Sequence, residues 1–165
     1  MGFILSSGNV ISFAEYEDVT ATDQRLFEAN EGLSETIVED ATTRATERIL
    51  TKIRSSDWWK SYYIKQSGTT PVSVPSPDPT KIKARTKDFT DLAVYYALSE
   101  ILLPKVADFG NADTAERQKI GFYDEKFRAL FTELLNAGDW YDFDGTGSVA
   151  DSEMKPSRQN LVRVR

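Results

Sequence analysis

The stretch of the chain with the clearest potential for chemistry is DFDGTGSVADSE, at residues 142–153. Its spacing fits the formula of an EF-hand calcium loop, in which oxygen ligands alternate along a tight turn and a glutamate closes it. Gly147 stands where such a loop bends sharply, and Val149 stands at its apolar position. Because calcium is a hard cation that takes several oxygen ligands, this spacing is typical of a calcium site. The residues at the ligand positions are Asp142, Asp144, Thr146, Ser148 and Glu153.

The residues around this loop favour a second interpretation, a polar glycine turn without a metal. Gly138 ends the preceding helical pattern several residues before Asp142, and Pro156 prevents a long helix after the loop. An EF-hand has a helix on each side of its loop. We therefore expect no metal and no cofactor, and we assign no catalytic residue. A calcium-binding helical interaction module that uses residues 142–153 is the alternative hypothesis.

The composition removes the commonest kinds of catalytic site. The 165 residues include no cysteine, which excludes disulfides, thiolate metal sites and a cysteine nucleophile. They include no histidine, so the commonest general base and metal ligand are missing. The net charge of −6 does not favour non-specific binding to nucleic acid, and no apolar run has the length of a membrane span. We expect a protein that is not an enzyme and has no membrane partner.

The elements that position the loop are helices, and a long buried one follows Ser34. Apolar or small residues recur there with the spacing of one helix face, at Ile37, Ala41, Ala45, Ile49 and Ile53. Residues 55–57 are polar capping residues and predict a break, followed by an aromatic helix. We interpret its aromatic residues as core rather than as a binding platform, because aromatic side chains bury large areas. These residues are Trp58, Trp59, Tyr62 and Tyr63.

Two further helical patterns follow. One begins at Thr86 and stops at Pro104, with apolar residues at Phe89, Leu92, Ala93, Tyr96, Ala97 and Ile101. The other begins near Thr114 and ends at residues 137–138, with apolar residues at Ile120, Tyr123, Phe127, Leu130 and Leu134. Residues 14–30 predict one or two short helices, the second capped by Thr20 or Thr22. The predicted fold class is mainly α, with three main amphipathic helices, short helices, extended arms at both ends and a proline-rich loop.

The helical domain is predicted to span residues 14–138. Two further segments lie at its ends, and a third interrupts it. Residues 1–13 predict an N-terminal arm or weak hairpin, which packs either on its own domain or on a neighbouring subunit. Residues 65–79 are rich in proline and serine and predict a flexible loop, either a solvated connection or an extension that reaches a partner. Residues 139–165 contain the Asp/Gly loop and a basic C-terminal arm.

The order of these parts is itself informative. A short N-terminal piece, FAEYEDVTATDQRLFEAN, precedes the helix IVEDATTRATERILTKI, which has a Trp-Trp pair after it. A proline-rich loop follows, and then come the helices DLAVYYALSEILLP and YDEKFRALFTELLNAG. This order resembles that of the small helical head-to-tail connector proteins of tailed bacteriophages, also called adaptor, neck or head-completion proteins. The resemblance covers roughly residues 14–138 and is one of pattern and order.

The resemblance implies a structural role in the virion. Such proteins form homo-oligomeric rings, often dodecamers, below the portal protein, where they extend the DNA channel and provide a docking surface for the tail or a stopper protein. The expected partners are therefore the portal, the tail or stopper protein, and copies of the chain itself. DNA passes through the lumen without sequence-specific binding, and an acidic body suits such a conduit because it repels phosphates. The expected location is the neck of the virion, and the host cytoplasm during assembly.

Overall fold

The computed structural model describes residues 3–30, 32–107, 110 and 114–154, and within these residues the chain is mainly helical with a small two-stranded sheet. The strands are β1 (Ile4–Ser6) and β2 (Asn9–Ser12). The helices are α1 (Tyr16–Thr22), α2 (Gln24–Ala29), α3 (Glu35–Ser55), α4 (Asp57–Ser67), the 3-10 turn η1 (Pro79–Lys81), α5 (Thr86–Ala97), the π-turn η2 (Leu98–Leu102), α6 (Leu103–Val106) and α7 (Ala115–Ala137). None of the described helices combines the length and the apolar character that crossing a membrane requires.

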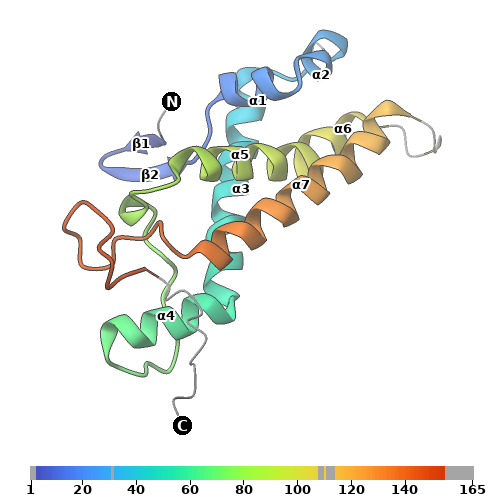
Figure 1. Cartoon of the computed structure of the whole chain (residues 1–165). Coiled ribbons are helices and arrows are strands. Elements are labelled where there is room, and N and C mark those ends of the chain that lie inside the picture. Colours follow the sequence, from blue (N-terminus) through green and yellow to red (C-terminus); the bar gives the residue numbers. More distant parts are fainter. Residues whose placement is uncertain (1–2, 31, 108–109, 111–113, 155–165) are drawn as a thin grey trace.

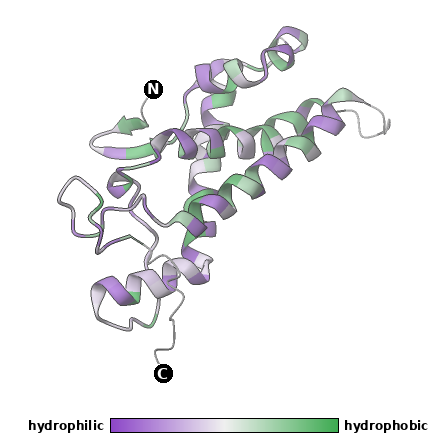
Figure 2. Ribbon diagram, viewed as in Figure 1, coloured by the Kyte–Doolittle hydropathy of each residue, from purple (hydrophilic) through white to green (hydrophobic). Residues whose placement is uncertain are grey.

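The long helix α3 crosses α5 and α7, which lie side by side (Figure 1). The short helices α1 and α2 lie at the N-terminal end of α3, and α4 lies at its C-terminal end. Figure 2 shows hydrophobic residues along α5, while hydrophobic and hydrophilic residues alternate along α7. The core therefore lies where α3, α5 and α7 meet, and the two ends of α3 carry separate groups of helices.

The predicted apolar face of α3 is buried at Val38, Ala41, Ala45, Ile49 and Ile53. Helix α3 packs against α5, and Leu92 and Ala93 of α5 are fully buried in the same core as the small side chains of Ala41 and Ala45. Burying one large aliphatic side chain contributes about 1.5–3 kcal/mol, so this stripe is a major source of stability. Periodicity correctly located α3 and α7, and α7 ends as predicted with Gly138 in the left-handed conformation.

The predicted break after α3 and the aromatic helix beyond it are both present. Ser56 caps α4 by accepting a hydrogen bond from the backbone N–H of Trp59 at 3.2 Å. Trp59 and Tyr62 are buried, and the ring of Trp58 lies 5.0 Å from the rings of both Tyr62 and Trp140. The interpretation of these aromatic residues as core is therefore confirmed for Trp59 and Tyr62, while Trp58 and Tyr63 are half-buried and pack against the core.

The prediction that Pro104 stops the second main helix is wrong. The chain stays helical through Pro104 to Val106 and widens into the π-turn η2 just before the proline. A proline ring clashes with the carbonyl group four residues earlier in a regular α-helix. The wider π-turn moves that carbonyl, which belongs to Glu100, and thereby accommodates the ring. Sequence periodicity does not show this local change of helix type.

The corner between α1 and α2 is also held differently from the prediction. The residue that caps α2 is Asp23, not Thr20 or Thr22, and it accepts a hydrogen bond from the Leu26 N–H at 3.3 Å. The same carboxylate accepts from Lys119 Nζ at 2.7 Å and from the Tyr123 hydroxyl at 3.3 Å. Both partners lie on α7, so one buried carboxylate ties the α1–α2 corner to the third main helix.

Residues 4–12 form a hairpin that packs on its own domain. Phe13, directly after β2, is fully buried, and its ring lies 4.7 Å from Phe3 and 5.4 Å from Phe89. Its backbone N–H donates to Thr46 Oγ1 at 3.0 Å, and its carbonyl accepts from Thr90 Oγ1 at 2.7 Å. The hairpin is thus continuous with the core at one end, while Leu5 and Ile11 remain exposed.

The predicted start of the proline-rich loop at residue 65 is wrong, because α4 extends to Ser67 and ends at Gly68 in the left-handed conformation. Side chains from elsewhere hold the second half of the loop. The Trp59 indole N–H donates to the Pro75 carbonyl at 2.7 Å, and Arg54 Nε donates to the Val74 carbonyl at 3.0 Å. At its tip, Val72 is fully exposed among the residues that the structure describes. The predicted basic C-terminal arm begins at residue 155 and lies outside the described residues.

Candidate functional site

The acidic loop, which we define as residues 142–153, leaves α7 through a short extended segment. Trp140 in this segment is fully buried, and its indole N–H donates to the Leu134 carbonyl at 2.8 Å. Tyr141 pairs with Ile82 in an isolated antiparallel bridge, flanked by a bond from the Asp142 N–H to the Lys81 carbonyl at 2.9 Å. The start of the acidic loop is therefore fixed against the chain between η1 and α5.

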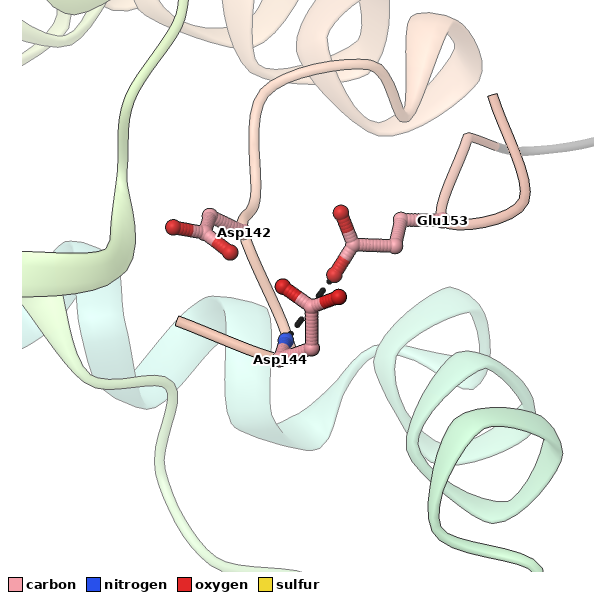
Figure 3. A group of neighbouring side chains, drawn as sticks. All are labelled: Asp142, Asp144 and Glu153. Atoms are coloured by element: carbon pink, nitrogen blue, oxygen red, sulfur yellow. Dashed lines mark hydrogen bonds between the residues drawn. The ribbon is translucent and has the colours of Figure 1, made fainter. Parts of the chain in front are cut away.

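Three carboxylates converge inside the acidic loop. One oxygen each of Asp142, Asp144 and Glu153 lie within 4.8 Å of one another. Figure 3 shows Glu153 reaching back from the far end of the loop toward the backbone of Asp144. Asp142 and Glu153 are buried, whereas Asp144 is exposed. The loop thus gathers three negative charges at a site that is open to solvent on one side.

The loop neutralises these charges largely with its own backbone. Asp142 accepts hydrogen bonds from three N–H groups, those of Gly145 at 2.8 Å, Thr146 at 3.1 Å and Gly147 at 2.7 Å. Glu153 accepts from the N–H groups of Phe143 at 2.7 Å, Asp144 at 2.9 Å and Ala150 at 2.8 Å. Hydrogen bonds to a charged acceptor are stronger than neutral ones, so these six bonds define the loop conformation.

The electrostatics follow from this arrangement. Burial raises the pKa of Asp142, but the N–H groups of Gly147, Gly145 and Thr146 outweigh it and hold that pKa below its usual value. On the neighbouring helix α4, burial raises the pKa of the Tyr62 hydroxyl, and the negative charge of Glu153 raises it further. Asp142 is therefore ionised at neutral pH, and the hydroxyl of Tyr62 on the neighbouring helix stays uncharged.

The donor set fits a hard cation such as calcium. It consists of oxygen atoms only. Asp142 Oδ2 and Glu153 Oε2 each accept one amide bond and keep a second lone pair for a cation, whereas Asp142 Oδ1 and Glu153 Oε1 each accept two amide bonds. The flanks do not fit a calcium sensor, because α7 ends at Ala137 and the residues around Glu153 form a turn closed by bonds to the Ala150 carbonyl. A bound ion here would cross-link the loop rather than move two helices apart.

The prediction from the sequence located part of this site. The EF-hand formula placed the three carboxylates in ligand positions, and the structure brings them together. It did not show that backbone amides already bond all three of them, Asp144 through the Thr146 N–H at 3.0 Å, or that the Thr146 hydroxyl donates to the Ser148 carbonyl at 3.2 Å. It also missed Gln66 of α4, whose side chain donates to the Ser152 carbonyl at 3.1 Å and attaches the loop to that helix.

Comparisons of the chain with known protein families, with curated proteins and with solved structures found no match.

Proposed function

We propose that the protein acts by protein–protein contact as a structural virion protein, a head-tail connector of the adaptor or neck type. The observation that carries this proposal is the N-terminal hairpin. Leu5 is 63% exposed and Ile11 is 42% exposed, although both belong to a segment anchored in the core through Phe13. Large apolar side chains held outward on an ordered strand are typical of a surface that another protein covers.

The backbone of the hairpin supports the same proposal. Within the described residues the sheet has two strands only, so each strand has an edge that no other strand pairs. Exposed strand edges readily accept a strand from another chain. Beside the hairpin lies an open groove of about 400 Å³, lined mainly by apolar residues that include Phe3, Leu5, Val10 and Ile82. A neighbouring subunit can use both the edge and the groove.

The resemblance to connector proteins suggests which assembly this contact surface belongs to. The proposal places copies of the chain in a ring, dodecameric in the connectors that it resembles, between the portal protein and the tail or a stopper protein. DNA then passes through the lumen without sequence-specific contacts, and the protein resides in the neck of the virion after assembly in the host cytoplasm. In this role the chain makes and breaks no covalent bonds.

Negative-stain electron microscopy of the chain mixed with the portal protein encoded in the same genome tests the proposal. We expect a ring of added density below the portal, and we expect Leu5→Asp to abolish it. Ser6→Asp is the matched control, because it places the same charge on the same strand at another exposed residue. Portal rings that stay unchanged in the presence of the folded wild-type chain would contradict the proposal.

Calcium binding at the acidic loop is the second candidate function, and the convergence of three carboxylate oxygens within 4.8 Å favours it. A ligand that binds only the folded state raises the free energy of unfolding, by about 2.7 kcal/mol at a hundredfold excess over its Kd. We therefore expect calcium chloride, but not sodium chloride of equal ionic strength, to raise the melting temperature. Asp144→Asn should remove the effect and Asp151→Asn, at an exposed residue of the same loop, should keep it. An unchanged melting temperature at millimolar calcium rules this candidate out.

A further inference from the structure

The charges of the chain are separated along its length. Residues 1–43 contain nine Asp and Glu against one Arg, whereas residues 44–65 contain six Lys and Arg against two Asp and Glu. The overall charge of −6 conceals this division. The boundary falls inside α3, so the two groups are carried toward opposite ends of one rigid helix.

The exposed residues show two charged ends. The acidic end, on α1, α2 and the first turns of α3, has the exposed residues Glu17, Glu28, Glu35, Glu39 and Asp40 against one exposed cation, Arg25. The basic end, on the last turns of α3 from residue 48 onward and on α4, has the exposed residues Arg48, Lys52, Arg54, Lys60 and Lys65 against one exposed anion, Asp57. Figure 1 shows α1 and α2 at one end of α3 and α4 at the other. A helix of the length of α3 spans roughly 30 Å, several times the Debye length at physiological salt. The two ends therefore do not neutralise each other within one molecule.

Local structure accounts for only part of this pattern. Among the described residues, the ten charges that define the two ends make one ion pair, Lys60 with Asp57 at 3.9 Å, and both of its side chains are largely exposed. Acidic residues near the start of α3 and basic residues near its end do favour the helix dipole. The dipoles of α1 and α4 likewise favour Glu17, in the first turn of α1, and Lys65, in the last turn of α4. Five of the ten charges lie outside such favourable terminal turns and are not explained in this way: Glu28, Glu39, Asp40, Arg48 and Lys60.

The surface of the basic end is shaped for a protein partner. An open groove of about 450 Å³ lies between the proline-rich loop and the α3–α4 junction. It combines two cations with hydroxyl groups and with apolar side chains from the loop; its lining residues are Thr51, Arg54, Ser55, Lys60, Val72, Ser73 and Val74. A surface that presents both carboxylates and apolar side chains matches this mixture. Nucleic acid matches it less well, since the negative net charge of the molecule repels phosphates at a distance.

We propose that the acidic end of one copy docks against the basic end of the next, so that copies of the chain associate head to tail. Such a contact uses two different surfaces of the same chain, and it produces a closed ring if the rotation between copies closes. This inference rests on the proposed function in so far as it names the surfaces by which connector subunits meet. Complementary charges also fix the register of neighbouring copies and exclude like ends from meeting.

Charge reversal with sedimentation velocity tests this contact. Arg48→Glu with Lys60→Glu gives a chain with two acidic ends, and Glu39→Lys with Asp40→Lys gives a chain with two basic ends. The wild type should associate at about 0.1 M salt and dissociate at about 1 M, where the Debye length falls from about 10 Å to about 3 Å. Each double variant alone should associate at least about tenfold more weakly than the wild type, because like charges then face each other. An equimolar mixture of the two variants should associate again.

The control variant is Lys105→Glu with Arg117→Glu, which changes the net charge equally at exposed residues outside both ends. It should associate like the wild type, and circular dichroism should show that every variant is folded. The rescue by mixing keeps the test independent of any loss of stability in one variant. A wild type that remains monomeric at low salt, or variants that do not associate when mixed, overturns the proposal.

A fluorescent DNA duplex tests whether nucleic acid, rather than a second copy of the chain, binds the basic end. Binding of this duplex to a monomeric wild type, lost in Arg48→Glu with Lys60→Glu, assigns the basic end to nucleic acid and overturns the proposal. Failure of the proposed function is distinguishable from failure of this inference. If the chain binds the portal but the mixed variants do not associate, the head-to-tail contact is overturned and the proposed function stands. If the mixed variants associate but the chain does not bind the portal, the proposed function is overturned and the contact stands.

Discussion

The proline-rich loop and the acidic loop are similar in length but are held in opposite ways. The acidic loop is held mainly by its own backbone, through six N–H groups that point at Asp142 and Glu153. The proline-rich loop is held mainly by side chains from other elements, among them Trp59 and Arg54. A loop of the first kind is encoded in a short run of sequence, and a loop of the second kind depends on the fold around it.

This difference explains which parts of the molecule were predictable. The formula for residues 142–153 describes local geometry, and the structure brings the three carboxylates together as the formula requires. The anchors of the proline-rich loop lie 16 and 20 residues away along the chain, and no local pattern indicates them. The amide donors of the acidic loop were also missed, because they depend on backbone angles such as the positive φ of Gly145 and Gly147.

The same distinction holds for the helices. The spacing of apolar residues located α3 and α7 and the break before α4, since each depends on local periodicity and capping. It failed at Pro104, where a π-turn rescues the helix, and at Asp23, whose capping role is combined with a contact to Lys119 nearly a hundred residues later. Contacts between distant segments override local signals at such points.

The largest effect should come from removing the main anchor of the proline-rich loop. Trp59→Ala deletes a buried indole and should lower the free energy of unfolding by about 3–5 kcal/mol. Trp59→Phe keeps an aromatic ring but leaves the Pro75 carbonyl without its donor, so about 1–3 kcal/mol of that loss should remain. Urea unfolding followed by circular dichroism measures both. Equal stability of Trp59→Phe and wild type would show that the loop does not need this hydrogen bond.

A smaller effect is expected in the acidic loop. Glu153→Gln replaces a carboxylate oxygen by an NH2 group that cannot accept from a backbone N–H, so at least one of its three bonds is lost. We expect a loss of about 1–3 kcal/mol in the free energy of unfolding, and faster hydrogen exchange confined to residues 143–150. Asp151→Asn, at an exposed residue of the same loop, is the control and should change neither quantity. Exchange that also accelerates in residues 72–78 would show that the two loops are not independent.

The pH dependence of stability should also distinguish the two loops, because Asp142 holds the acidic loop and the Tyr141 hydroxyl holds Asp78 of the proline-rich loop. The pKa of Asp142 is depressed in the folded state, so its stabilising contribution is present above the unfolded value near 4 and is lost as the pH falls through the folded value. Burial raises the pKa of Tyr141, whose hydroxyl accepts from the Asp78 N–H, to about 12. Its contribution is present below the unfolded value near 10 and is lost as the pH rises toward 12. Asp142→Asn should flatten the acid limb only, and Tyr141→Phe the alkaline limb only, in melting temperatures measured across pH.

The smallest effect should come from the tip of the proline-rich loop. Val72 is fully exposed, so Val72→Ser should change the free energy of unfolding of the isolated chain by less than about 0.5 kcal/mol. The same substitution should weaken association between copies, because Val72 lines the groove at the basic end. Sedimentation velocity at low salt, beside urea unfolding, checks both statements. A variant that is destabilised but associates normally would place Val72 in the core of the loop instead of at an interface.

All three tryptophans of the chain, Trp58, Trp59 and Trp140, lie in one aromatic cluster, with ring centroids 5.0–6.1 Å apart where they touch. Intrinsic fluorescence therefore reports on a single neighbourhood, the junction of α4 with the segment that leads into the acidic loop. The α1–α2 corner and the hairpin contain no tryptophan and are therefore silent in tryptophan emission. An unfolding curve recorded by tryptophan emission that precedes the curve recorded by circular dichroism would identify this junction as a separate cooperative unit.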